Sequence, residues 1–546
     1  MRIRFIRLVA AAALLASSLG VQARVVKIDV PDAETWKNDA LAACGWGDTV
    51  QFDVPIIVNQ NWGYGGFSGL KVSVRRVFSP TNQALPKSDE FYELQSLNSK
   101  ATFTLTGCGY RRDGERLHNL TGVVTGDLTV KYISGKWEGN NTRDALKNNV
   151  PSVDMNGVHN VLVCAANLEY YLVKALGTGF GPRNYTEHQR QRTKVKQALA
   201  KIHADVYGFV EIEQGQDALV ELAADLTELT GDTYDYIRDS GTSSETNSYT
   251  KSGYVYNSDK IKPVGRLISN NTGVANRKKV QAFVLKSNNE RFIFSINHFK
   301  AKSGSGTGMD ADQQDGQGIF NYKRTVEAQS IVRNMRSYQN AYADNDVLIM
   351  GDLNAYAKED PIQTLLDAGM FDLHRRFHAD SSYSYVYAGQ AGYLDHAIAN
   401  DALIKQVTGM AVWHVNSDES DEYTYDSSYD QTVFRYSDHD PVLVGLKLDS
   451  TRSIPLHAVD PIDYAKISIS NGELFLSNVS QREDNNGDPL NGYYEIYDVT
   501  GHLVQGITLI EESPCPVGEK LTSGVYVVRV YYAGKIKALK LMKLLK

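Results

Sequence analysis

Side chains that can bind a cation or move a proton stand at or beside the ends of several apolar, strand-like segments of this chain. Asn167 and Glu169 end VLVCAANLE, Glu211 ends VYGFVE, His298 ends FIFSINH, Asp352 and Asn354 end VLIMGDLN, Asp395 ends YLD, and Asp438 with His439 precedes DPVLVGL. Because α/β sheets bind their ligands at the carboxyl ends of their strands, we expect these side chains to converge.

Oxygen donors dominate this set of residues. Carboxylate and amide oxygens are the ligands of Mg²⁺, Mn²⁺ or Ca²⁺ rather than of zinc. When only one or two carboxylates hold Mg²⁺, the ion keeps waters that it can deliver to a phosphate. A single His or Asn at a strand end is more often a satisfied structural group, but the whole set predicts a phosphoester-cleaving enzyme that uses a hard metal ion.

The segment from 155 to 448 must position these side chains, and it alternates strand and helix patterns. An apolar stripe at helical spacing follows Thr186, which we expect to cap the helix: Val195, Ala198, Leu199 and Ile202. Two more helices are predicted at about 217–230 and 323–343. This alternation predicts an α/β domain in which helices cover the faces of the sheets.

Six short motifs follow one another along this segment: NLE, VEIE, INHFKAKSG, GDLNAY, GYLDHAIAN and SDHDP. In this order they resemble the endonuclease/exonuclease/phosphatase family, which has the DNase-I-like fold. DGQGIFNYKR, YSYVYAGQAGYLDH and WHVNSDE are most similar to the secreted bacterial nucleases of that family. The resemblance implies an α+β four-layered sandwich, in which helices flank two mixed β-sheets.

The resemblance also implies a role for each motif residue. Asn167 and Glu211 would hold the divalent cation, Mg²⁺ or else Mn²⁺ or Ca²⁺, with Asp438 close enough to help. His439 would act as a general base or phosphate ligand, and Asp395 would fix its tautomer by a hydrogen bond to the other ring nitrogen. Glu169 has a less certain role, because it is one methylene longer than the family's aspartate.

The remaining motif residues would act on the phosphate and the attacking water. His298 would face the scissile phosphate, while Asp352 and Asn354 would position the water and bind a phosphoryl oxygen. The reaction expected is in-line attack of an activated water on a phosphodiester. Basic residues crowd 260–302, and this stretch is either a solvated face or a track for a nucleic-acid backbone, with Arg277 and Lys300 the strongest candidates.

Two polar stretches bear on substrate access. SGSGTGMDADQQDGQG, residues 303–318, is expected to be a solvated loop; the alternatives are that it closes over the substrate or binds Ca²⁺ through Asp310, Asp312 and Asp315. DESDEYTYDSSYD, residues 418–430, would repel a polyanion unless a metal or lysine residues neutralised it.

The chain begins with a pattern that predicts export. Residues 1–23 combine three arginines, a short apolar run and small residues before Arg24, as in a secretory signal peptide. Its removal would take the formal charge from -7 to -10. Export also permits a Cys44–Cys108 disulfide without requiring one. No later stretch is long and apolar enough to predict a membrane span.

Two further domains flank the central one. Residues 24–150 alternate strand patterns with Gly and Asn, which predicts a β-rich domain, either a barrel or a sandwich of the oligonucleotide/oligosaccharide-binding (OB) kind. Its aromatic residues either fill a core or stack on bases: Trp46, Trp62, Tyr64, Phe67 and Tyr110. Residues 455–546 predict a small β-sandwich, and YDVTGHLV with LTSGVYVVRV resembles the C-terminal sorting domain of the type IX secretion system; an ordinary adhesive sandwich is the alternative.

Composition limits the functional classes. A hydrophobic content of 42% indicates a globular protein. With 57 basic and 64 acidic residues, the chain cannot bind nucleic acid through a uniformly basic surface. Four cysteines without a CxxC pair exclude a zinc ribbon. The chain has no GxSxG, HExxH or Walker motif, so serine hydrolase, zincin and NTPase functions lack support.

We therefore expect a secreted, metal-dependent nuclease that cuts DNA, with RNA as a further candidate substrate. A phosphatase or phospholipase C on the same fold, acting on inositol phosphates or sphingomyelin, is the alternative. Against it, no CDR-type motif replaces YLDH, and no apolar hairpin is evident that would dip into a membrane. A surface-binding protein with an inactive nuclease domain would need lost catalytic positions, and none is lost.

Overall fold

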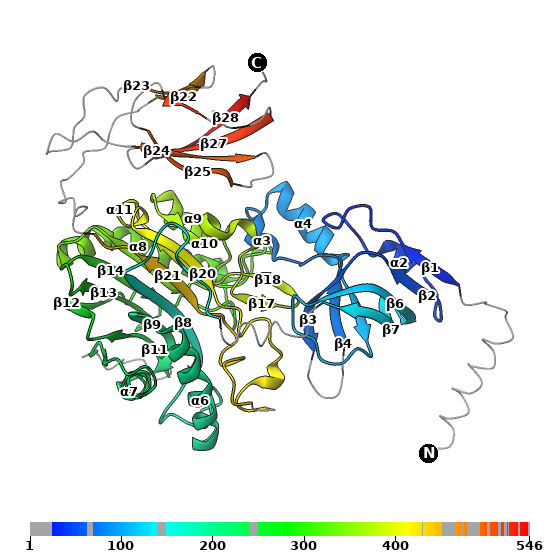
Figure 1. Ribbon diagram of the computed structural model, residues 1–546, viewed down its shortest axis with the longest axis horizontal. Coiled ribbons are helices and arrows are strands. Elements are labelled where there is room, and N and C mark those ends of the chain that lie inside the picture. The colour runs from blue at the N-terminus through cyan, green and yellow to red at the C-terminus, as the bar shows by residue number, and fades with distance from the viewer. Residues whose placement is uncertain are drawn as a thin grey trace.

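The computed structural model describes residues 24–62, 69–138, 149–239, 249–274, 276–427 and 430–449, together with strands between residues 466 and 543. Figure 1 shows a central domain of strands and helices with β-rich parts on either side of it in the sequence. The predicted signal peptide, residues 1–23, lies outside the described residues. No helix in the described part is long and apolar enough to cross a lipid bilayer.

The central domain contains two six-stranded sheets. The first has the order β10 (Tyr234–Tyr236), β11 (Thr250–Asn257), β9 (Val206–Glu213), β8 (Val161–Tyr171), β21 (Val442–Leu446), β20 (Val407–Val412). The second has the order β12 (Ile261–Ser269), β13 (Lys278–Leu285), β14 (Arg291–Asn297), β15 (Val347–Asp352), β19 (Asp395–Ala399), β16 (Phe371–Asp372). Both sheets are mixed, because β8–β9 and β14–β15 are parallel while the other pairs are antiparallel.

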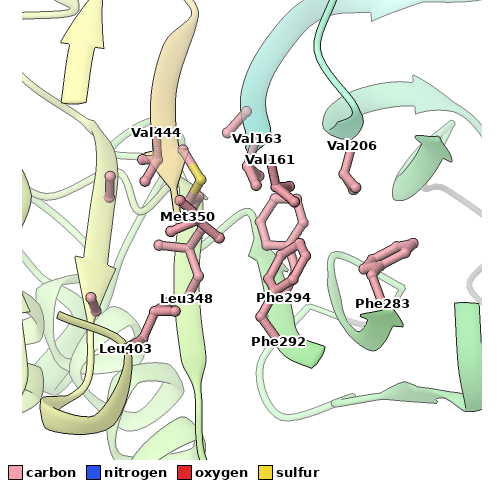
Figure 2. Packing of buried hydrophobic residues seen from close by; sticks show 14 of the residues in the cluster. Val161, Val163, Val206, Phe283, Phe292, Phe294, Leu348, Met350, Leu403 and Val444 are labelled. Atoms are coloured by element: carbon pink, nitrogen blue, oxygen red, sulfur yellow. The ribbon is translucent and has the colours of Figure 1, made fainter. Parts of the chain in front are cut away.

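The two sheets pack face to face through their apolar side chains. Val161 and Val444 from the first sheet meet Phe294 and Met350 from the second in one buried cluster (Figure 2). Burial of this apolar area is the main stabilising contribution to the sandwich. Central strands such as β9, β13, β15 and β21 are buried along almost their whole length, because helices or loops cover their other face. The edge strand β12 is mostly half-buried or exposed.

Helices cover the outer faces of both sheets. α6 (Tyr185–Ile202) and α7 (Asp217–Thr230) pack through Leu199 and Leu222 on the first sheet. α8 (Asn321–Tyr342) and α9 (Asp360–Asp367) pack through Ile331 and Leu365 on the second, and short helices α10 (Leu373–His378) and α11 (Asp401–Ile404) complete the domain. The predicted four-layered sandwich, with mixed sheets and flanking helices, is confirmed.

The helix expected behind Thr186 begins slightly earlier than predicted. Asn184 is the N-cap of α6, and its side-chain oxygen accepts a hydrogen bond from the backbone N–H of Glu187 at 3.1 Å. Thr186 lies inside the first turn, so its assignment as the cap was wrong. Asparagine caps helices at least as well as threonine, which is why the helix can start two residues sooner.

The N-terminal part is a sheet that closes on itself. Its strands are β1 (Val25–Ile28), β2 (Thr49–Phe52), β3 (Ile56–Trp62), β4 (Gly69–Ser73), β5 (Phe103–Thr106), β6 (Arg116–Gly126) and β7 (Thr129–Trp137). Five of them pair in a ring, β6-β3-β4-β5-β7 and back to β6, and β2 then β1 extend it from β6. The ring makes this part a barrel, while its OB type and its ligand stay predictions.

The predictions for the aromatic and cysteine residues of this part differ in their outcome. Trp46 is 77% exposed, and the hydroxyl of Tyr110 donates to Glu419 of the central domain at 2.9 Å. The side chains of Trp62, Tyr64 and Phe67 lie outside the described residues. Cys44 and Cys108 are free thiols, so the permitted disulfide does not form here.

The barrel docks on the acidic stretch 418–430 of the central domain. Arg112 pairs with Glu419 at 2.6 Å and with Asp418 at 3.4 Å, and Arg76 pairs with Asp418 at 2.9 Å. Arg112, Asp418 and Glu419 are almost completely buried. The expectation that the stretch repels polyanions therefore needs correction for Asp418 and Glu419, because arginines from a distant part of the chain neutralise them.

We expect Arg112→Ala to destabilise the folded protein by about 3–5 kcal/mol, because it leaves two buried carboxylates without their main cation. Differential scanning calorimetry and limited proteolysis would measure the lower midpoint and the earlier release of the barrel. Arg116→Ala is the matched control, since Arg116 forms an exposed 4.0 Å pair with Glu138 and such pairs contribute at most about 1 kcal/mol. Equal effects of the two substitutions would contradict this assignment.

Beyond residue 449 the described strands form two sheets. β22 (Lys466–Ser470), β23 (Glu473–Ser477) and β26 (Cys515–Pro516) make one. β25 (Leu503–Ile510), β24 (Gly492–Asp498), β27 (Gly524–Tyr532) and β28 (Lys535–Lys543) make the other. The sorting role expected for this segment stays a prediction.

Candidate active site

Six strands of the two sheets bring the predicted residues to one edge of the sandwich. Asn167 lies on β8, Glu211 on β9, and Asp352 ends β15, while His298 directly follows β14. Asp395 begins β19 instead of ending a strand; because β19 runs antiparallel to β15, Asp395 is the register partner of Asp352. By the same logic the start of β21, which follows Asp438 and His439, lies beside β8.

The backbone of this edge is irregular at the functional positions. Glu169, Tyr170, Glu211 and Asn354 have φ values of 47°, 52°, 60° and 49°, in the left-handed region that residues other than glycine rarely adopt. The register between β8 and β9 slips between Asn167 and Tyr171, as at a β-bulge. Such irregularities re-aim side chains and cluster at functional sites.

His439 is held by a carboxylate on one side and an aromatic ring on its face. Its Nδ1 lies 2.7 Å from Oδ2 of Asp395, which also accepts a 2.7 Å hydrogen bond from the hydroxyl of Ser384. The ring of Tyr385 stacks on the imidazole with centroids 4.6 Å apart. Ser384 and Tyr385 were not predicted; both stand in the YSYVY segment of the resemblance, but their residue types alone did not indicate a role.

Charge sets the protonation of His439. Burial lowers its pKa, but the carboxylates of Asp395, Asp438 and Asp352 outweigh burial and raise the pKa well above its ordinary value. Its Nε2 lies 3.9 Å from Asp438 and 4.0 Å from Asp352. Nε2 is therefore the atom at which His439 can hold or release a proton toward a substrate.

Asp352 is the centre of a second group of contacts. Its Oδ2 accepts from the side-chain amides of Asn354 at 3.1 Å and of Asn167 at 3.4 Å, and the backbone N–H of Asn354 donates to Oδ1 at 2.8 Å. The Nε2 of His298 lies 3.7 Å from Asp352 and 3.6 Å from Glu211. The side chains predicted from separate motifs thus lie together, while the role of each stays a prediction.

The two central histidines have opposite electrostatic environments. Burial, followed by the positive charge of Arg277, lowers the pKa of His298 well below its ordinary value. His298 is thus a neutral imidazole near neutral pH, able to donate one hydrogen bond, whereas His439 favours the cation. Titratable groups whose environments push their pKa values apart are typical of acid–base sites.

Carboxylates crowd the position expected for the cation. Burial and then the charge of Asp438 raise the pKa of Glu211 to about 7, and burial and Asp438 raise that of Glu169 well above its ordinary value. Oε2 of Glu169 is buried and has no hydrogen-bond partner. Neighbouring buried carboxylates that repel one another, one with an orphaned oxygen, fit a bound divalent ion.

The described residues contain no group of three or more His, Cys, Asp and Glu side chains arranged to enclose a metal ion by themselves. Mg²⁺ does not require such a group, because it keeps several waters and uses one or two carboxylates. Glu211 and Asp438 would supply those carboxylates, and Asn167 would supply an amide oxygen. Asn167 Oδ1 also accepts from the backbone N–H of Glu169 at 2.9 Å, which fixes its orientation.

The basic stretch 260–302 is mostly structural. Lys278 pairs with Glu327 at 2.9 Å, Lys279 with Asp239 at 2.6 Å and Lys302 with Glu359 at 2.5 Å, each with a buried carboxylate. The interpretation of the whole stretch as a nucleic-acid track therefore does not hold for these lysines. Buried cations need such partners, which is the physical reason for their positions.

The two strongest substrate candidates of that stretch differ. Arg277 is half-buried and its Nε has no hydrogen-bond partner, while its charge acts on both His298 and Glu211. Arg277 therefore remains suited to bind a phosphate. Lys300 is less available, because its Nζ lies 4.4 Å from the ring centroid of Phe320 and donates to the carbonyl of Ser303 at 3.2 Å.

The 303–318 loop uses its carboxylates locally. Asp310 accepts from the backbone N–H of Lys323, Asp312 from that of Gln314 and Asp315 from that of Gln317. These bonds are typical of turns and helix starts. They favour the solvated-loop interpretation over a Ca²⁺ site.

Two cavities flank the catalytic residues. The first, of about 700 Å³, lies between the barrel and the central domain, and we name it the interdomain cavity; its lining includes Thr81, Phe91 and Gln95 from the barrel and His298, Asp352 and His439 from the central domain. The second, of about 600 Å³, we name the acidic cavity, because six carboxyl groups line it: Asp113, Glu169, Glu419, Asp421, Asp426 and Asp438. The hairpin of β17 (Tyr385–Tyr387) and β18 (Gln390–Gly392) borders both.

A sandwich of two mixed sheets with this cluster of imidazoles and carboxylates at one edge has the architecture of a phosphoester hydrolase. Residues 160–439, more than half of the chain, match the endonuclease/exonuclease/phosphatase family, and the chain belongs to that family. Members of the family are phosphoesterase hydrolases that generally use divalent metal ions. No curated protein matches the chain in sequence.

Solved structures with a similar fold come from several organisms. An endonuclease/exonuclease/phosphatase protein from Bacteroides vulgatus is 16% identical, with a TM-score of 0.37, and the match covers 53% of this chain and 99% of that one. A mannosyl-6-phosphatase from Bacteroides thetaiotaomicron is 16% identical, with a TM-score of 0.35 and 52% and 99% covered. TDP2 from D. rerio, complexed with a single-strand DNA product, is 13% identical, with a TM-score of 0.35 and 52% and 97% covered.

Proposed function

We propose that this protein is a divalent-metal-dependent nuclease that hydrolyses the phosphodiester bonds of DNA, with RNA as a further substrate. The observation that carries the proposal is the juxtaposition of the His439–Asp395 pair with Glu211, Asp438 and Asp352 at one edge of the sandwich. It supplies a proton-handling imidazole, oriented by a carboxylate, beside a cation site. Hydrolysis of a phosphodiester is promoted both by proton transfer and by a cation that stabilises negative charge on the phosphate.

The chain's own residues account for most of the reaction. Asn167, Glu211 and Asp438 would hold the cation, which when bound would stabilise negative charge on the phosphate. Asp395 keeps a proton on Nδ1 of His439, so that Nε2 can take a proton from the attacking water or hold one toward a phosphoryl oxygen. Asp352 and Asn354 would orient the water, and neutral His298 with Arg277 would donate hydrogen bonds to the phosphate.

Metal binding is expected to depend on pH through Glu211. Because its pKa is raised to about 7, Glu211 is increasingly protonated below about pH 7, and protons then compete with the cation for its oxygens. The apparent Mg²⁺ affinity should fall by up to about tenfold per pH unit below this value and level off above it. Calorimetric Mg²⁺ titrations one unit below and one unit above about pH 7 would measure this, and equal affinities would contradict the role of Glu211.

The proposed activity can be tested with the chain from Arg24 onward. We expect it to degrade DNA with Mg²⁺ or Mn²⁺, and we expect EDTA to abolish the cleavage. Parallel assays with RNA, sphingomyelin and an inositol phosphate separate the alternatives. Consumption of sphingomyelin or the inositol phosphate with intact DNA would replace the nuclease proposal by a phospholipase C or phosphatase on the same fold.

We also propose that the protein is exported and passes through the type IX secretion machinery. The support is the sequence pattern of residues 1–23 and the YDVTGHLV and LTSGVYVVRV motifs. N-terminal sequencing of the protein from cell fractions should find Arg24 as the first residue, outside the cytoplasm. An intact Met1 on a cytoplasmic protein would contradict this proposal.

A further inference from the structure

The interdomain cavity lies beside the catalytic residues, and a second domain forms part of its wall. Helices α3 (Pro80–Gln83) and α4 (Asp89–Ser99) of the barrel contribute Pro80, Thr81, Phe91 and Gln95. The rest of the wall includes the 303–318 loop, which packs on Phe91 so closely that a Cβ at Gly316 would lie 2.5 Å from its ring. The cavity therefore exists only when the barrel is docked.

The lining has the chemistry that recognises a planar ring. Phe91, Tyr356, Tyr385 and Tyr387 bring aromatic rings to it, and the amides of Gln95 and Gln390 have no hydrogen-bond partner among the described residues. Tyr387 is 67% exposed at the end of β17, although large aromatics usually bury most of their surface. Aromatic faces stack on unpaired bases, while side-chain amides bind base edges.

The barrel also holds the hairpin that carries Tyr385 and Tyr387. Backbone hydrogen bonds of 2.8 Å join Ser79 to Ala391 and Ala391 to Val77, and Nζ of Lys71 donates to the carbonyl of Ala388 at 2.8 Å. A fourth hydrogen bond, of 3.2 Å, runs from the backbone N–H of Tyr393 to the side-chain oxygen of Asn82. This clamp keeps the hairpin in place beside His439.

The size and charge of the surroundings favour one unpaired nucleotide over a continuous duplex. A cavity of about 700 Å³ accommodates a small-molecule-sized group, and a paired base would first have to leave its stack to enter. On the other side of the hairpin, two of the six carboxyl groups of the acidic cavity pair with arginines, Glu419 with Arg112 and Asp421 with Arg435. The other four form no ion pair with an arginine among the described residues: Asp113, Glu169, Asp426 and Asp438. Further backbone phosphates would be repelled there.

We propose that the interdomain cavity binds the base of an unpaired nucleotide whose phosphodiester lies at the catalytic residues, with Tyr387 as the stacking platform and Gln95 and Gln390 as hydrogen-bond partners. This inference rests on the proposed nuclease function and names the substrate class for it. The barrel is accordingly a substrate-binding part of the active enzyme.

The test compares three DNA probes with the full chain from Arg24: a single-stranded oligonucleotide, its duplex, and the same single strand with abasic sites. We expect the base-bearing single strand to have the highest kcat/KM. Tyr387→Ala should lower kcat/KM for it by about 5- to 150-fold, mainly through KM, because stacking on one aromatic side chain contributes that much per base. The preference for the base-bearing over the abasic strand should fall by a similar factor, and Gln95→Ala should lower it as well.

Tyr185→Ala is the matched control, because Tyr185 is also 67% exposed but lines neither cavity; it should leave both kcat/KM and the preference unchanged. Two results would overturn the inference while leaving the nuclease function intact: cleavage of duplex and single strand at equal rates, or an unchanged preference in Tyr387→Ala. If no oligonucleotide is cleaved but another phosphoester is, the nuclease function itself fails, and base binding fails with it.

Discussion

His439→Ala is expected to lower kcat for phosphodiester cleavage by a factor of about 10² to 10⁴, the usual contribution of a positioned acid or base. The reason is geometric and electrostatic. Asp395 at 2.7 Å and the stacked ring of Tyr385 leave this imidazole one orientation, with Nε2 toward the carboxylates of the site. Alanine removes the imidazole together with the positive charge that helps to lower the pKa values of Asp352 and Glu211.

Steady-state kinetics on a DNA substrate would measure the effect, with circular dichroism to show that the variant is folded. Asp395→Asn should also lower kcat strongly, because an amide no longer fixes the tautomer of His439. His159→Ala is the matched control, since His159 also pairs with an aspartate, Asp154 at 2.6 Å, but is not part of the site. A folded His439→Ala protein with wild-type kcat would exclude His439 from the chemistry.

Glu211→Gln should abolish most of the activity by weakening the cation site. The substitution keeps the size and the neighbour that donates to Oε2, the backbone N–H of Tyr170 at 3.1 Å, but removes the negative charge. Removal of even an outer partner of a metal site commonly costs about 10- to 100-fold in metal affinity or activity, so loss of a direct carboxylate should cost at least that. Because the charge of Asp438 no longer opposes a second carboxylate, the folded protein should not become less stable.

Two measurements separate this effect from a general defect. Calorimetric Mg²⁺ titration should show the weaker binding directly, and raising Mg²⁺ in the DNA assay should restore part of the rate. Glu228→Gln, an exposed change on α7, is the control and should leave both unchanged. Wild-type Mg²⁺ affinity together with a wild-type rate in Glu211→Gln would remove Glu211 from the metal site.

The local pattern of the sequence was enough to predict the main helices of the central domain. Helices α6, α7 and α8 lie within two residues of the predicted ranges, because an apolar stripe at helical spacing identifies a packed helix face. The exception, the cap at Asn184 instead of Thr186, shows that two capping residues two positions apart compete for a helix boundary. The strand-end rule also placed Asn167, Glu211, His298 and Asp352 at one edge.

The same rule misjudged Asp395, since antiparallel strands present their starting residues at the edge where parallel strands end.

The pattern of charged residues predicted their environment less well than the pattern of apolar residues predicted the helices. Lys278, Lys279 and Lys302 looked like a basic track, and Asp418 and Glu419 like a repulsive surface, but each forms an ion pair with a residue far away in the sequence. A run of charges in the sequence does not reveal its partners.

The amino-acid sequence by itself determined the layers of the central domain and the residue types of its site, because periodicity and strand ends are local properties of the chain. Only the tertiary structure decided that the barrel docks beside the site, that Ser384 and Tyr385 fix the Asp395–His439 pair, and that Phe91 and Gln95 line the interdomain cavity. These features depend on contacts between residues up to 342 positions apart, as in the Arg76–Asp418 pair. No spacing or pattern along the chain predicts such a contact, because the contact forms where the surfaces of two domains pack together.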